Sequence, residues 1–278
     1  LKAKAKGTAK ITCTVKRKKK TYKLTCKVKV KAKKTVVASS LKDTYTKIVP
    51  YMGTCLNYGS ASNPRELQNA STMKFVKKQY NSFTLENEMK PDAILGSSAK
   101  LISVADAKKK GYYIPAGYAE STVPELAFTT VDKSLEAAKN NGLKMRAHTL
   151  VWHSQTPSWF FTKNYDGSKV VTPAVMDARL DFYIHNVMGH VMDKEKALTG
   201  SAGSIVYAWD VVNEYLHRPS FAFFKTWTSV YADMGNSPSY VKKAFEIAYD
   251  MLKSYQATDK VTLFYNDYNT YFGVKDTL

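Results

Sequence analysis

Apolar and polar residues alternate with two different periods along this chain. Over residues 11–15 and 22–30 an apolar side chain falls at every second position, which is typical of β-strands. The two segments flank the basic run 16–20, so they predict a β-hairpin. Beyond residue 41, short apolar runs alternate with segments of helical spacing. The runs predict strands at 52–56, 80–85, 143–148, 205–212 and 261–265, and the helical segments cover 65–79, 132–141, 173–192 and 238–255.

Strands that alternate with helices predict a parallel sheet joined by right-handed crossovers. A doubly wound sheet would carry a Gly-rich phosphate loop after an early strand, and the sequence contains neither G-x-G-x-x-G nor a P-loop. The α/β pattern therefore favours a (β/α)8 TIM barrel preceded by a short β-hairpin. Five strands are predicted where closure needs eight, so we expect an incomplete barrel of about five βα units.

The positive charge of the chain is concentrated at its start. The 278 residues include 42 Lys plus Arg and 23 Asp plus Glu, a net charge of +19. Residues 1–40 hold 15 of the basic residues and none of the acidic ones, which leaves 27 minus 23, or +4, for residues 41–278. Since the charge is local and Tyr22 is the one aromatic residue near it, nucleic-acid binding by residues 1–40 is the less favoured interpretation. The preferred interpretation is that the lysines form the solvent-exposed face of the two predicted strands.

The hydrophobic content of 44% is enough for a sizeable core and excludes a wholly disordered chain. No apolar run approaches the length of a membrane-spanning helix. Neither an initiator methionine nor a signal peptide opens the sequence, so we expect it to begin inside a longer product.

The predicted hairpin places two of the three cysteines near one another. With a turn centred near residues 19–20, Cys13 would lie across from Cys26, and Val15 from Leu24. Either a disulfide or a pair of small buried hydrophobic side chains fits this arrangement. Cys55 is expected to be an apolar strand residue. Residues 1–34 resemble the last strands of a bacterial immunoglobulin-like surface module, residues 35–40 are expected to form a linker, and residues 41–278 form the partial barrel.

Unusual polar and aromatic residues follow the predicted strands. In a parallel barrel the catalytic and binding residues lie at the carboxyl ends of the strands. Asn213 and Glu214 end the strand at 205–212, where a carboxylic acid among aromatic side chains can act as a general acid and the amide can bind a substrate hydroxyl. The alternative is a surface glutamate that opens the next helix. We favour the catalytic interpretation of Glu214, because residue types suited to sugar binding recur at the other strand ends.

Two further clusters support a polyhydroxylated ligand. Residues 84–90 place three charged side chains and an amide at one strand end, and residues 146–159 combine indole, imidazole and amide groups. Indole faces stack on sugar rings, and the polar groups bond hydroxyls. A metal site is less favoured, because the two histidines of this segment lie five residues apart and lack the spacing of zinc ligands.

Four segments together resemble glycoside hydrolase family 10, the retaining endo-β-1,4-xylanases. They are 83–90, 148–160, 209–214 and 263–269, in the order in which the family has them. The resemblance covers about residues 41–278 and implies a TIM barrel that acts on xylan, without a cofactor. It implies that Glu214 is the catalytic acid/base and that Asp210 and Asp267 are supporting carboxylates. The substrate-binding residues that it implies are Glu86, Asn87, Lys90, His148, Trp152, Gln155, Asn213 and Tyr268.

The chain departs from the family pattern in two places. Many members have Trp where this sequence has Pro91, which changes one wall of the expected cleft. Retaining hydrolysis also needs a second carboxylate as nucleophile, which the family places on a later strand in a Thr-Glu-x-Asp-like motif. No such motif follows Glu214. We therefore expect the nucleophile to lie beyond residue 278 and the piece by itself to be inactive.

Two alternative functions would give different experimental results. A non-catalytic xylan-binding or surface protein would keep the Lys90 and Trp152 subsites without chemistry. A metal-dependent TIM-barrel hydrolase would lose activity with a chelator. The resemblance favours a secreted or cell-surface enzyme, with cell-wall association through residues 1–34.

Overall fold

The structure of this protein is a computed structural model that describes residues 5–31, 40–218, 225–231 and 238–271. The chain divides into two compact units, residues 1–39 and 40–278, and each is described by itself. The predicted linker at 35–40 lies almost entirely outside the described residues.

The first unit contains β1 (Gly7–Arg17) and β2 (Lys20–Val30). The strands of the second unit are β3 (Gly53–Leu56), β4 (Ser82–Leu85), β5 (Leu101–Ser103), β6 (Thr122–Pro124), β7 (Lys144–Trp152), β8 (Val206–Asn213) and β9 (Thr262–Asn266). Its α-helices are α1 (Leu41–Tyr45), α2 (Ala70–Gln79), α3 (Pro91–Leu95), α4 (Val104–Lys109), α5 (Thr129–Asn141), α6 (Pro173–Thr199), α7 (Trp227–Val230) and α8 (Ser239–Ser254). Short 3-10 helices cover Glu66–Gln68, Ser158–Phe161, Lys163–Tyr165 and Tyr215–His217.

The hairpin of the first unit forms as predicted, but its register is different. Arg17 pairs with Lys20, so the turn consists of Lys18 and Lys19 alone, with φ of 45° and 61°. This is the backbone of a two-residue type I′ turn, whose twist matches the strands. Cys13 therefore faces Leu24 and Cys26 faces Ile11, which corrects the predicted pairing of the two cysteines. Both thiols are free and exposed, so they form neither a disulfide nor a buried pair.

The second unit is built on a parallel sheet of five strands in the order β3-β4-β7-β8-β9. These are the five predicted strands, each within a few residues of its predicted bounds. Because every pairing is parallel, all five carboxyl ends lie along one edge of the sheet. The described residues thus provide five of the eight strands that close a TIM barrel.

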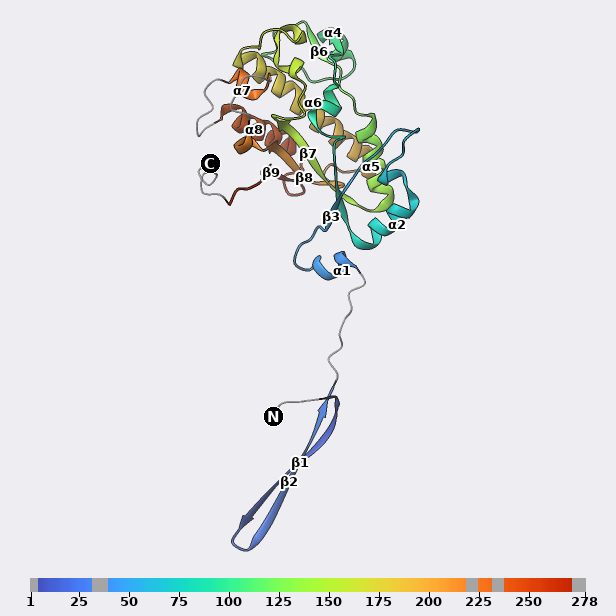
Figure 1. Ribbon diagram of the computed structural model, residues 1–278, viewed down its shortest axis with the longest axis vertical. Coiled ribbons are helices and arrows are strands. Elements are labelled where there is room, and N and C mark those ends of the chain that lie inside the picture. The colour runs from blue at the N-terminus through green and yellow to red at the C-terminus, as the bar shows by residue number, and fades with distance from the viewer. Residues whose placement is uncertain (1–4, 32–39, 219–224, 232–237, 272–278) are drawn as a thin grey trace. The chain divides into compact units, whose positions relative to one another are not determined.

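Helices α5 and α8 contact strands β7 and β8 of this sheet. Figure 1 shows α5, α6 and α8 side by side against it, and α6 contacts both of the others. The core between them contains large buried side chains such as Met176, Leu180, Trp209 and Leu252. The long connection from β4 to α5 also holds α3, α4 and the small β5–β6 sheet. These short elements were not predicted, since each is too brief to show two full periods.

Helix α6 runs seven residues past its predicted end at Met192. The extra turns are rich in Ala, Leu, Lys and Glu, which favour helix, and the helix ends at Gly200 with φ of 83°. The carboxylate of Glu195 accepts hydrogen bonds from the backbone N–H groups of Gly203, Ile205 and Val206. This buried contact ties the end of α6 to the start of β8. Within the described residues, no helix is long and apolar enough to span a membrane.

A buried arginine anchors the segment between β7 and α6. The side chain of Arg179 in α6 is fully buried and pairs with Glu120. It also donates to the carbonyl of Phe160 and lies over the ring of Tyr165 at 3.7 Å. This single side chain therefore connects α6 to the β7–α6 segment and to the loop before β6.

Replacing Arg179 with methionine should destabilise the fold strongly. The change leaves the Glu120 carboxylate without its partner, and breaking a buried ion pair typically costs about 3–5 kcal/mol of unfolding free energy. The measurement is urea unfolding of the full-length gene product. Arg65→Met is the control, because the Arg65 side chain is exposed and, within the described residues, forms an ion pair with Glu66 alone, at 3.6 Å. A similar loss in both variants would contradict the role of Arg179.

Candidate active site

The predicted site residues follow four neighbouring strands at the same edge of the sheet. Glu86 and Asn87 follow β4, Trp152 ends β7, Asn213 and Glu214 end and follow β8, and Asp267 and Tyr268 come just after β9. His148 lies inside β7, and Lys90 and Gln155 lie in the loops beyond β4 and β7. The parallel pairing of the strands is what brings these distant segments together.

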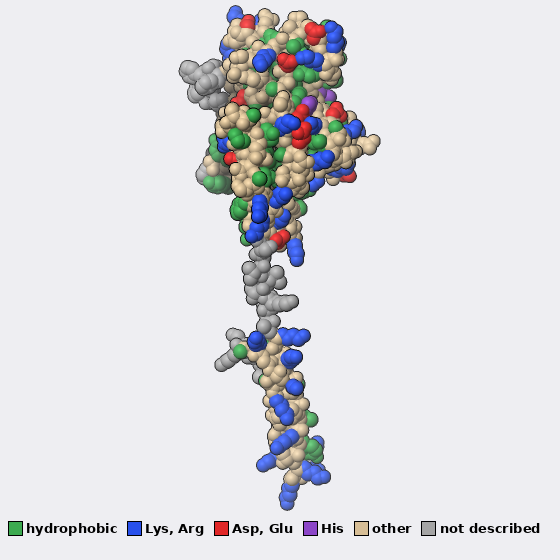
Figure 2. Space-filling model, turned by 90° about the vertical axis from the view of Figure 1, so that its right-hand side faces the viewer, with side chains coloured by type: hydrophobic (Ala, Val, Ile, Leu, Met, Phe, Trp, Pro, Cys, Tyr) green, Lys and Arg blue, Asp and Glu red, His purple; other side chains and the backbone are tan. Residues whose placement is uncertain are grey.

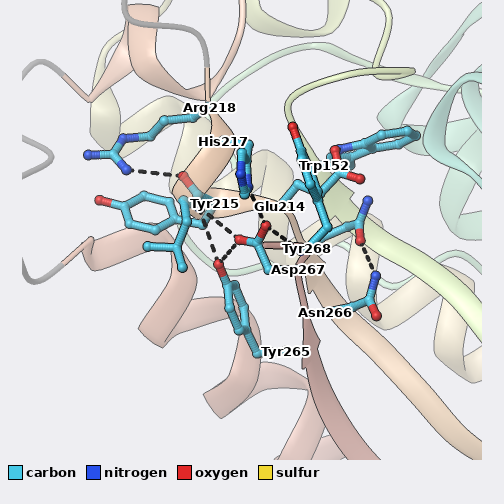
Figure 3. Close-up of polar contacts among 11 residues, drawn as sticks. Trp152, Glu214, Tyr215, His217, Arg218, Tyr265, Asn266, Asp267 and Tyr268 are labelled. Carbon is cyan, nitrogen blue, oxygen red and sulfur yellow. Dashed lines mark hydrogen bonds and ion pairs between the residues drawn. The ribbon is translucent and has the colours of Figure 1, made fainter. Parts of the chain in front are cut away.

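Glu214 sits in a sharp turn directly after β8. Its backbone is left-handed, with φ of 56° and ψ of 38°. Its N–H donates to the carbonyl of Asn266 at 2.7 Å. Its carboxylate oxygen Oε2 accepts a hydrogen bond from Nε1 of Trp152 at 2.9 Å (Figure 3). The backbone and the side chain of Glu214 are thus both hydrogen-bonded to residues of neighbouring strands. The carboxyl group therefore has a defined direction at the sheet edge.

Asn213 is buried beside this turn. Its side-chain Oδ1 accepts from Nδ2 of Asn266 at 2.6 Å, and Asn266 is labelled in Figure 3. Because Asn266 fixes the orientation of this amide, the amino group of Asn213 is left to donate elsewhere. Such an amide beside a carboxyl group suits a sugar hydroxyl.

Asp210 lies three residues before the end of β8 and forms hydrogen bonds with two residues of β7. Its carboxylate accepts hydrogen bonds from Nε of Arg146 at 3.0 Å and from Nδ1 of His148 at 2.9 Å. Burial alone would raise the pKa of Asp210, but the bonds from His148 and Arg146 and their charge lower it below its ordinary value of 3.8. Since the carboxylate can only accept, His148 donates through Nδ1, and its Nε2 remains for a ligand.

The lowered pKa of Asp210 predicts a pH-dependent contribution to stability. A folded-state pKa below the unfolded value stabilises the fold above about pH 5 and loses this effect as the pH falls through 3.8 and below. We expect Asp210→Asn to destabilise the full-length gene product more at pH 7 than at pH 3. Urea unfolding at both pH values measures the difference between variant and wild type. An equal difference at both would contradict the assignment.

A second group of predicted residues is joined across the loops after β4 and β7. Nζ of Lys90 donates to Oε1 of Gln155 at 2.8 Å and to Oδ1 of Asn87 at 3.1 Å. Nε2 of Gln155 also donates to Asn87, at 3.2 Å. The ammonium of Lys90 lies 5.1 Å from the centre of the Trp152 ring. Trp152 therefore connects this amide and ammonium cluster to the carboxyl group of Glu214.

Glu86 and Pro91 lie next to this cluster. Glu86 accepts a hydrogen bond from Nδ2 of Asn57, which follows β3. Asn57 extends the polar edge to a further strand and was missed from sequence, since a lone asparagine after a short strand carries no distinctive pattern. Pro91 is buried at the first position of α3, where its missing N–H costs nothing.

On the opposite side of Glu214, Asp267 organises a compact network (Figure 3). Its fully buried carboxylate accepts from the Tyr265 hydroxyl, from Nδ1 of His217 at 2.6 Å and from the N–H groups of Leu216 and Tyr268. Burial would raise the pKa of Asp267, but these hydrogen bonds lower it. The network ties the turn after Glu214 to the end of β9.

Tyr268 presents an aromatic wall to this side of the site. Its ring stacks on the imidazole of His217 with centroids 3.5 Å apart, and 49% of the residue is exposed. His217 was missed from sequence, because its partners Asp267 and Tyr268 lie some 50 residues away.

Two cavities of similar size open on the described surface. One, of about 510 Å³, is lined by His153, Gln155, His217 and Lys225 among others, so it adjoins the site. Burial lowers the pKa of His153, although the nearby negative charge of Glu214 acts to raise it. The other cavity, of about 540 Å³, lies between α6, α8 and the segment 110–113 that follows α4, and it contains none of the predicted site residues.

Comparison with known proteins agrees with this geometry. The family model for glycosyl hydrolase family 10 matches residues 40–277. The chain is 46% identical over 241 residues to an endo-1,4-beta-xylanase A of Butyrivibrio fibrisolvens, covering 86% of this chain and 55% of that protein. It is 38% identical over 205 residues to an endo-1,4-beta-xylanase A of Thermotoga neapolitana, covering 73% of this chain and 15% of that protein.

A solved structure of an endo-1,4-beta-D-xylanase of Clostridium thermocellum, complexed with xylohexaose, superposes with a TM-score of 0.62 at 28% identity. The match covers 92% of this chain and 44% of that one. The chain thus spans about half the length, or less, of the relatives that it matches. Fold, strand-end chemistry and sequence similarity agree, and the chain belongs to glycosyl hydrolase family 10.

Proposed function

We propose that the gene product containing this chain is a retaining endo-1,4-β-xylanase with Glu214 as its general acid/base. The observation that carries the proposal is the placement of Glu214 at the carboxyl edge of the parallel sheet, with its carboxyl group bonded by Trp152. The relatives named above as endo-1,4-beta-xylanases support the choice of substrate.

In the first step, Glu214 protonates the glycosidic oxygen while the bond from that oxygen to the anomeric carbon breaks. A second carboxylate attacks the anomeric carbon from the opposite face and forms a glycosyl-enzyme ester. In the second step, Glu214 accepts a proton from water as that water attacks the same carbon, and the ester bond breaks. Glu214 is thereby protonated again.

The surrounding residues divide into two sides of a cleft. Glu86, Asn87, Lys90, Gln155, Trp152 and His148 would bind the sugars on the non-reducing side of the cleaved bond, and Asn213 the hydroxyl group of the ring under attack. Tyr268 would line the leaving-group side. Lys90 and Gln155 already bond one another, so this part of the site needs little rearrangement to receive hydroxyl groups.

Two buried carboxylates are poor choices for the nucleophile. Asp210 is bonded to Arg146 and His148, and Asp267 accepts four hydrogen bonds. Because these hydrogen bonds hold both carboxylates in place, neither is free to attack the anomeric carbon. We assign them instead to the support of His148 and of the turn after Glu214.

We further propose that the enzyme acts outside the cell, secreted or at the cell surface, because xylan is a polymer. Residues 1–34 would associate with a cell wall.

The test is release of reducing sugar from unsubstituted xylan by the full-length gene product. Internal cleavage should lower the viscosity of the xylan solution well before much sugar is released. Binding of xylan without any release would favour the non-catalytic alternative, and activity abolished by a chelator would favour a metal-dependent hydrolase.

A further inference from the structure

The hairpin of the first unit has one face made entirely of lysine and threonine. The observed register places on one side every strand residue of even number in β1 and its odd-numbered partners in β2. We call this set the lysine–threonine face: it comprises Thr8, Lys10, Thr12, Thr14, Lys16, Thr21, Lys23, Thr25, Lys27 and Lys29. All of these residues are exposed, and Figure 2 shows basic side chains along the hairpin.

The positive charges on this face crowd one another. Lys10 lies directly opposite Lys27, and Lys16 is diagonal to Lys23. Like charges in such cross-strand positions destabilise a sheet. Residues 1–40 contain no Asp or Glu to relieve this repulsion. Soluble surfaces usually intersperse both signs of charge, so a face of this composition is suited to a polyanion that neutralises it.

We propose that the lysine–threonine face binds a linear acidic polysaccharide, a chain of sugars that carry carboxylate groups. Lysine ammonium groups would pair with the carboxylates, and threonine hydroxyls would bond the sugar hydroxyls between them. Eleven-residue strands span about 35 Å, enough to follow several sugar units. The choice of a polysaccharide rests on the proposed function, since a polysaccharide hydrolase works among such polymers.

Two other anionic partners fit this face less well. Single-stranded nucleic acid binds on aromatic side chains that stack with its bases, and Tyr22 lies on the opposite face with Val15 as its partner. A membrane surface would engage apolar and basic side chains together. Here the apolar residues Ile11, Val15 and Leu24 lie on the opposite face, so the lysine–threonine face offers a membrane no apolar side chain to insert.

The test uses the full-length gene product with Glu214→Gln, so that little xylan is degraded during the measurement. The probe is polygalacturonate, with neutral unsubstituted xylan as the reference polymer, in native affinity gels over a salt series. The triple variant K10Q/K23Q/K27Q should weaken polygalacturonate binding about ten-fold or more and flatten its salt dependence. The control K18Q/K19Q/K20Q removes the same charge from the turn end and should change binding less than about two-fold. Neither triple variant should change binding of neutral xylan.

Equal weakening by both triple variants would overturn the proposal, because attraction would then depend on total charge and not on the face. Tighter binding of duplex DNA than of polygalacturonate at the same salt would also overturn it. Hydrolysis of neutral xylan by the protein with an intact Glu214 is measured in parallel. A failure of hydrolysis with intact polygalacturonate binding would refute the proposed function alone, and the reverse result would refute this inference alone.

Discussion

Replacing Glu214 with glutamine in the full-length gene product is expected to lower the rate of xylan hydrolysis about 10²–10⁴-fold, the usual contribution of general acid/base catalysis. Glutamine keeps the size of the side chain and can still accept the hydrogen bond from Trp152, but it cannot donate a proton to the glycosidic oxygen. The measurement is reducing-sugar release from unsubstituted xylan at saturating substrate. Little change in affinity for xylan is expected.

An aryl xyloside with a good leaving group makes this test sharper. Such a substrate needs little protonation, so the first step should survive in the Glu214→Gln variant while the second slows for want of a base. Added azide needs no base and should restore turnover, yielding a xylosyl azide of retained configuration. Glu246→Gln is the matched control, because Glu246 is an exposed residue of α8 whose ion pair in the described part of the chain is with Lys242 at 3.5 Å. Undiminished xylan hydrolysis by the Glu214 variant would refute its role.

The 278-residue chain produced by itself is expected to release no reducing sugar from xylan. In the described sheet, β3 and β9 each have one neighbouring strand, so both edges of the sheet are open. Open edges favour association with other chains over a single compact fold. The two buried carboxylates beside the proposed acid/base at the sheet edge, Asp210 and Asp267, are held by Arg146, His148 and His217 and are not free to attack.

The full-length gene product, assayed under the same conditions, is the positive control for this experiment. Circular dichroism of the 278-residue chain distinguishes a folded but inactive protein from an unfolded one. Turnover by the short chain that disappears on Glu214→Gln would contradict the prediction, since it would show that these residues contain a complete catalytic pair.

Local patterns were sufficient to predict the main elements of the second unit. The five strands and four long helices were found because a period of two or 3.6 residues is created by side chains within one element. The three-residue strands β5 and β6 and the short helices α3 and α4 were missed, because each shows less than two periods. The hairpin register was wrong for a related reason: two turns that differ by one residue have nearly the same sequence signature, and the φ values of Lys18 and Lys19 decide between them.

The sequence by itself determined most of the residues that reach the site, because the ends of parallel strands can be located from their apolar runs; Asn57 and His217 were missed. It did not determine which residues touch. The offset between β7 and β8 changes from 62 at His148–Asp210 to 61 at Trp152–Asn213. That shift brings the Trp152 indole to Glu214, and similar long-range pairing brings His217 to Asp267. Such contacts depend on strand register, and register is set by the packing of the whole sheet and its helices, so only the tertiary structure could decide them.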